Sequence, residues 1–158
     1  MGLDMYMYVH TFEVRGNWEN KDDEVKNFYP EKLKVLQDDI YKRNFLSKLT
    51  EYQVAYWRKA NAIHGWIIEN CADGEDDHQD IWMGKERLTK LLNVVKAVLD
   101  DNSLADKLLP VEKGFFFGSQ EYDDWYFEDL KYANYIIPLL LDYLEKNPYD
   151  EIYYRASW

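Results

Sequence analysis

The sequence has little cysteine and no long apolar segment, and each shortage excludes a class of protein. Its 158 residues include one cysteine, Cys71, which rules out an intramolecular disulfide and a cysteine-only metal cluster and favours a reducing compartment. No run of about 18 apolar residues is present, so we expect no membrane span. The first residues also lack the basic-then-apolar pattern of a signal peptide. These features predict a cytoplasmic protein.

Basic residues are also scarce. The chain has 19 Lys and Arg against 30 Asp and Glu, a formal net charge of -11. Because nucleic-acid phosphates need a basic surface, this balance argues against direct binding to nucleic acid. It leaves room for a small anionic ligand held by a few local donors.

Aromatic residues, in contrast, are abundant. They make up 17% of the chain, with 14 Tyr and 6 Trp, and such side chains suit pockets and interfaces because they are part apolar and part hydrogen-bonding. The length and the apolar fraction of 47% fit one domain, 1–158, with a genuine core. A charged insertion is expected at about 13–49, with one amphipathic helix after Pro30 that carries Leu33, Leu36 and Ile40.

The two ends of the sequence have the pattern of strands. Apolar residues alternate along 3–10, and 151–157 has the composition of a closing strand. Helical periodicity predicts three main helices at 51–70, 86–100 and 120–145. We therefore predict an α+β fold, a small mainly antiparallel sheet that uses both chain termini and is covered by three main helices.

Polar side chains interrupt the apolar stripe of the first predicted helix. A capping box of Thr50 and Gln53 starts this helix, and Asn61 and His64 fall within its apolar face with Arg58 at the edge. Two accounts stay open. Asn61 and His64 are satisfied core polar groups, or they point with Arg58 into a pocket. We predict that both side chains are mostly buried and hydrogen-bonded to groups from the stretch 114–126.

The stretch 114–130 is the second candidate region. Two glycines bracket a phenylalanine run, and Ser119 is a natural N-cap for the helix that follows. A helix N-terminus presents free amides and the positive end of the helix dipole, which can bind an anion, although many ordinary helices begin in the same way. Tyr122, Trp125 and Tyr126 follow in the first turns of this helix.

Spacings typical of metal sites and of catalysis are absent. The acidic loop 76–80 lacks the calcium-loop pattern, and Asp124 with Glu128 lacks a third ligand nearby. The sequence 118–120 is not a nucleophile elbow, and no nucleophile, base and orienting group share a recognisable spacing. We expect no metal, no cofactor and no catalytic residues, and enzymatic activity is left open.

Four segments carry a resemblance to a known family: MGLDMY at 1–6, YWRKANAIH at 56–64, GFFFGSQEYDDWYFEDL at 114–130 and SW at 157–158. They resemble a family of small, functionally uncharacterised bacteriophage and prophage proteins. The resemblance covers about half of the chain and implies a phage-encoded protein of the host cytoplasm, with the charged segment 13–49 as a variable insertion.

Two functional hypotheses remain. The first is non-enzymatic binding of a small anionic, ring-containing, nucleotide-like ligand, with a role in counter-defence. The alternative is an acidic protein that inhibits a nucleic-acid-binding enzyme of the host by direct interaction. The expected partner is thus a small molecule or a host protein, and the oligomeric state stays open. The candidate ligand-binding residues are Arg58, Asn61, His64, Phe117, Ser119, Tyr122, Trp125 and Tyr126.

Overall fold

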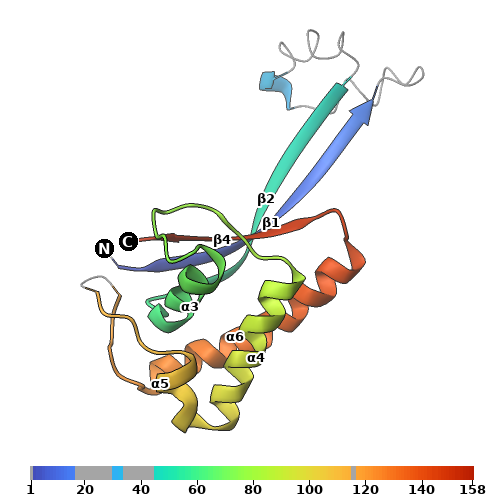
Figure 1. Cartoon of the computed structure of the whole chain (residues 1–158). Helices are drawn as coiled ribbons and strands as arrows, with labels where there is room; N and C mark the ends of the chain where they lie inside the picture. The colour runs from blue at the N-terminus through green and yellow to red at the C-terminus, as the bar shows by residue number, and fades with distance from the viewer. Residues whose placement is uncertain (1, 17–29, 34–44, 115–116) are drawn as a thin grey trace. The chain divides into compact units, whose positions relative to one another are not determined.

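The structure is a computed structural model that describes residues 2–16, 30–33, 45–114 and 117–158. Contacts within the chain divide it into two compact units. One unit consists of Met1–His10 with Tyr52–Trp158, and the other is Thr11–Glu51. The first unit contains the helices α3 to α6 and the strands that they cover (Figure 1).

A four-stranded antiparallel sheet in the order β2-β1-β4-β3 confirms the predicted α+β class. Its strands are β1 (Asp4–Gly16), β2 (Phe45–Arg58), β3 (Ile81–Trp82) and β4 (Glu151–Ser157). The register of β1 on β4 pairs Asp4 with Ser157 and His10 with Glu151. The strands predicted at the two ends of the sequence are therefore neighbours in one sheet.

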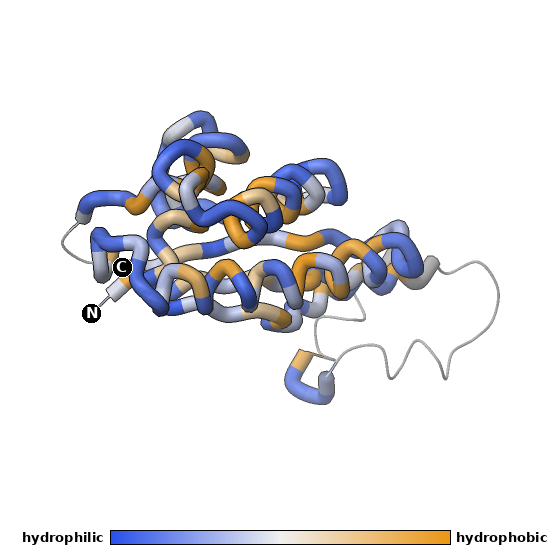
Figure 2. The backbone as a smooth tube through the Cα atoms, turned by 90° about the horizontal axis from the view of Figure 1, so that it is seen from below, coloured by the Kyte–Doolittle hydropathy of each residue, from blue (hydrophilic) through white to orange (hydrophobic). Residues whose placement is uncertain are grey.

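The helices of the first unit lie on one side of β1 and β4 (Figure 1). They are α3 (Asn61–Cys71), α4 (Lys85–Asp100), α5 (Ala105–Leu108) and α6 (Asp124–Lys146), with a 3-10 turn, η2, at Asn102–Leu104. Alternate strand residues such as Met5, Met7 and Ile152 are fully buried beneath them. Apolar positions recur along each helix between polar ones, as Figure 2 shows, which is the pattern of helices with one face on a core.

The predicted helix 51–70 is wrong in its first half. Tyr52 to Arg58 belong to β2, and α3 begins only at Asn61. In β2, Ala55 and Trp57 are buried while Tyr52 and Tyr56 are exposed, which is the period of two that a strand requires. The capping box at Thr50 therefore does not form. Residues 85–100 and 124–146 are helical close to the predicted bounds, and 81–82 form a short strand.

The second unit, Thr11–Glu51, contains the C-terminal part of β1, the N-terminal part of β2 and a 3-10 turn, η1, at Glu31–Leu33. The Lys48 ammonium lies 3.0 Å from the Glu13 carboxylate, which links the two strands. Of the amphipathic helix predicted after Pro30, Leu33 lies in η1, whereas Leu36 and Ile40 fall outside the described residues.

Helix α6 continues through Pro138. Proline has no amide proton, so the carbonyl of Asn134, one turn earlier, lacks its helical donor. The side-chain oxygen of Asn134 is buried and has no hydrogen-bond partner among the described residues. The hydrogen-bond acceptors in this part of the helix are therefore incompletely satisfied. None of the described helices combines the length and the apolar character needed to cross a membrane.

Replacing Pro138 by Ala is expected to raise the free energy of unfolding by about 2–3 kcal/mol. A proline inside a helix destabilises the folded state by roughly 3 kcal/mol relative to alanine. The unfolded chain of the variant is more flexible, and this lowers the gain in stability by up to about 1 kcal/mol. Urea denaturation measures the difference. Pro148→Ala, beyond the end of α6, is the matched control and should gain nothing. A Pro138→Ala variant no more stable than wild type would contradict this account.

Candidate functional site

The side chain of Asn61 connects the start of α3 to the segment before α6. Its amide nitrogen donates to the carbonyl oxygens of Phe117, at 2.9 Å, and Ser119, at 2.8 Å. Its oxygen accepts from the Glu112 amide at 2.9 Å. The residue is buried and its hydrogen-bonding capacity is largely used by this segment. The prediction that Asn61 is buried and bonded to the 114–126 stretch is therefore confirmed.

His64 is also buried, but its predicted partners are wrong. Nδ1 lies 2.8 Å from the Tyr154 hydroxyl and Nε2 lies 3.0 Å from Asp76, while Phe117 makes only a ring contact at 5.5 Å between centroids. An ionised carboxylate only accepts, so we assign the proton to Nε2, and Nδ1 accepts from Tyr154. Burial lowers the pKa of His64 more than Asp76 raises it, which keeps the ring neutral.

The series Asp76, His64 and Tyr154 has the order of a catalytic relay, but its last hydroxyl is sealed in the core. Tyr154 is 1% exposed and His64 2% exposed, so a substrate cannot reach either group. Burial raises the pKa of the Tyr154 hydroxyl well above its usual range. We interpret this chain of hydrogen bonds as a satisfied core network that joins α3, β4 and the loop after α3.

The predicted N-cap at Ser119 is wrong. Helix α6 begins at Asp124, and its N-cap is Asp123, whose carboxylate accepts from the Tyr126 amide at 3.0 Å. Ser119 Oγ instead accepts from the Glu121 amide at 3.2 Å in the turn before the helix. Hydrogen bonds, that of the Tyr126 amide first, lower the pKa of Asp123. The positive end of α6 is thus already occupied by a carboxylate, which removes the predicted anion site there.

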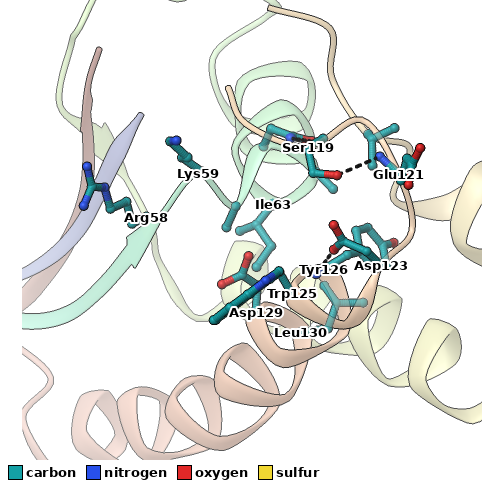
Figure 3. Close-up of a pocket in the computed structure, with 14 residues that line it drawn as sticks. Arg58, Lys59, Ile63, Ser119, Glu121, Asp123, Trp125, Tyr126, Asp129 and Leu130 are labelled. Atoms are coloured by element: carbon teal, nitrogen blue, oxygen red, sulfur yellow. Dashed lines mark hydrogen bonds between the residues drawn. The ribbon is translucent and has the colours of Figure 1, made fainter. Parts of the chain in front are cut away.

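Beside this helix start lies a cavity of about 270 Å³, between the end of β2, the first turn of α3 and the first turns of α6 (Figure 3). Its walls are largely apolar, with Ile63 and Leu130 among them. The indole of Trp125 stands at its rim and is 79% exposed. Tyr126 closes the inner side, and its hydroxyl donates to the Leu109 carbonyl oxygen at 2.9 Å. The cavity size suits a small ligand.

Two cations stand on the β2 side of this cavity. Arg58 is 64% exposed, and its Nε lies 4.0 Å from Asp4, a distance that leaves the guanidinium available. Lys59 follows with a positive φ of 63° and is not in an ion pair with any described residue. It packs on Gly118, whose φ is 90° and where a Cβ would lie 2.9 Å from the Lys59 Cβ. Gly118 is therefore required for this close approach.

The carboxyl group of Asp129 lies within the cavity, and the sequence patterns did not single it out. Figure 3 shows it pointing toward Ile63, next to the Trp125 ring. No group in the described part of the chain donates a hydrogen bond to this carboxyl group or forms a salt bridge with it. Burial, with a smaller contribution from Asp123, raises its pKa to about 7. The cavity therefore has a carboxyl group that titrates near neutral pH.

The structure brings together five of the eight predicted site residues. Arg58, Asn61, Ser119, Trp125 and Tyr126 line the cavity beside α6.

The other three predicted residues lie elsewhere. His64 and Phe117 border a second hollow of about 440 Å³, and the hydroxyl of Tyr122 donates to Asp106 at 3.2 Å. Lys59 and Asp129 were missed as site residues. The helical spacing of Trp125 and Asp129, which places both on one face, was the signal that could have found Asp129.

Comparisons with protein-family models, with curated proteins and with solved structures found no match to this chain. Within the described residues, no three His, Cys, Asp or Glu side chains are arranged so that they could hold a metal ion. The chemistry of the cavity is therefore that of its aromatic ring, its two cations and its carboxyl groups.

Replacing Asn61 by Leu is expected to lower the free energy of unfolding by about 2–4 kcal/mol, because three backbone groups lose their partner in a buried place. Asn70→Leu, an exposed position of the same helix, is the control and should change it by less than about 1 kcal/mol. Chemical denaturation distinguishes the two. Full stability of Asn61→Leu would show that these hydrogen bonds do not hold the segment.

Asp129 should make the folded state less stable as pH rises. Its folded pKa is raised, so the folded state binds more protons than the unfolded state between pH 4 and about 7, and stability falls across that range. Above pH 7.5, Asp129→Asn should be more stable than wild type by an amount on the order of 1–2 kcal/mol, after allowance for partial solvent screening. Thermal unfolding of wild type and Asp129→Asn at pH 5 and pH 8 measures this. A stability difference between the two proteins that is the same at both pH values would contradict the prediction.

Proposed function

We propose that this chain is a non-enzymatic binding protein for a small, ring-containing anionic ligand of nucleotide-like chemistry. The observation that carries the proposal is the exposed Trp125 ring at the rim of a cavity that also has two cations, Arg58 and Lys59, on its β2 side. A flat ring stacks well on an indole, and a cation on the rim meets an anionic group of the same ligand.

The carboxyl groups of the cavity limit the charge of this ligand. Glu121, Asp123 and Asp129 oppose the two cations, so a highly charged anion is disfavoured. A mononucleotide-like group fits this balance better than a long oligonucleotide. No described group in the cavity forms an assembled nucleophile and base, which supports binding without conversion.

A resemblance of sequence motifs supports the biological setting that we propose. They resemble those of phage and prophage proteins, and a phage protein that sequesters a nucleotide-like signal in the host cytoplasm would act in counter-defence.

The alternative function is inhibition of a host nucleic-acid-binding enzyme by an acidic surface. Two apolar side chains one turn apart on α6, Tyr135 and Leu139, are 65% and 50% exposed, and the net charge is -11. Such a surface suits a protein partner. It does not require the cavity.

The test measures binding of nucleoside monophosphates by calorimetry. We expect saturable binding that weakens about tenfold or more in Arg58→Ala and in Lys59→Gly, because each removes a charge-assisted contact. Lys59→Gly is suited to this test, since glycine accepts the positive φ at this position. Lys131→Ala, a cation outside the cavity, is the control.

The ligand should be recovered intact by chromatography. A cleaved ligand would make the protein an enzyme. Absence of binding, together with capture of a host nucleic-acid enzyme that Tyr135→Ser and Leu139→Ser abolish, would favour the acidic inhibitor.

A further inference from the structure

The carboxyl group of Asp129 lies in the cavity, where a bound ligand can donate hydrogen bonds to it. Its carboxyl group points into the cavity, and no donor from the described residues satisfies it. A partly buried carboxylate without a donor is unfavourable, and a ligand that supplies donors removes that cost.

The indole of Trp125 at the rim of the cavity fixes how a ring would approach this carboxyl group. Trp125 lies one helical turn before Asp129, so both side chains project from the same face of α6. Ile63 and Leu130 form the apolar wall around them. A flat ring that stacks on the Trp125 indole therefore presents its edge, not its face, to Asp129.

We propose that Asp129 makes the cavity specific for a flat heterocycle whose edge carries two adjacent N–H donors, as the guanine base does. A carboxylate accepts two parallel hydrogen bonds from such an edge. Hypoxanthine offers only one of these donors, and adenine places an acceptor beside its amino group, which the carboxylate repels. This inference rests on the proposed binding function and names its ligand class.

The two ends of the ligand would then be held by different parts of the cavity. The heterocycle meets Asp129 and Trp125 on α6, and its phosphate reaches Lys59 and Arg58 at the end of β2. Selectivity between bases comes from α6, and affinity for the phosphate comes from β2.

Calorimetry with GMP, IMP and AMP separates these roles. We expect wild type to bind GMP at least tenfold more tightly than IMP or AMP, which is the size of effect that a bidentate contact supplies. Asp129→Asn should abolish this preference. Glu128→Gln, the neighbouring carboxylate outside the cavity, should keep it. Lys59→Gly should weaken GMP, IMP and AMP by the same factor.

The pH dependence provides a second readout. The other charged residues that line the cavity are Arg58, Lys59, Glu121 and Asp123. Because the ionised form of Asp129 accepts the two donors, the preference for GMP over IMP should grow as pH rises from 5.5 to 7.5 and then level off. The ratio of the two affinities cancels the titration of the phosphate that both ligands share.

Two results would overturn the inference while the binding function survives. These are equal affinity of wild type for GMP and IMP, or a preference for GMP that persists in Asp129→Asn. Absence of binding by all three nucleotides would overturn both the inference and the proposed function.

Discussion

The hydrogen bonds of the Asn61 side chain hold together the two regions on which the cavity depends. One amide group at the start of α3 bonds to the backbone of Glu112, Phe117 and Ser119, a segment with little regular structure of its own. Without these bonds, buried backbone groups of that segment would lack partners, at a cost of about 1–3 kcal/mol each. The position of Ser119 and Gly118 next to Lys59, and hence one wall of the cavity, follows from them.

The sequence predicted the secondary structure correctly where one periodicity of apolar residues dominated a segment. The alternation along 3–10 and 151–157 indicated adjacent strands, and the stripe of α4 indicated a core helix. The failure at 51–58 has a physical cause. Val54 and Trp57 fit a helical stripe that continues to Asn61, but residues 55–58 alternate between buried and exposed positions. Tertiary pairing with β1 decides between the two patterns, and the turn at Lys59 that separates strand from helix uses a positive φ without a glycine.

The sequence predicted that two motifs lie together at the site. It did not predict which charged groups surround the cavity. The segments 56–64 and 114–130 do come together, and Arg58, Asn61, Ser119, Trp125 and Tyr126 share one cavity. The role of Ser119 was misread because several residues in a row can cap a helix. An aspartate is as good a cap as a serine, and only the backbone path decides which one the helix uses. Because Asp123 is the N-cap, α6 begins at Asp124, and the carboxylate of Asp123 lies where we expected an anionic ligand.

Two carboxyl groups of the same helix illustrate how position sets the chemistry of the cavity. Asp123 receives hydrogen bonds from the helix N-terminus, which lower its pKa, while Asp129 lies further along the helix in an apolar environment that raises its pKa to about 7. The first carboxylate compensates the helix dipole and is already satisfied. The second keeps its hydrogen-bonding capacity for a partner from outside the protein. A cavity with this asymmetry favours a ligand that brings donors to α6 and an anion to β2, and it disfavours one with negative charge at both ends.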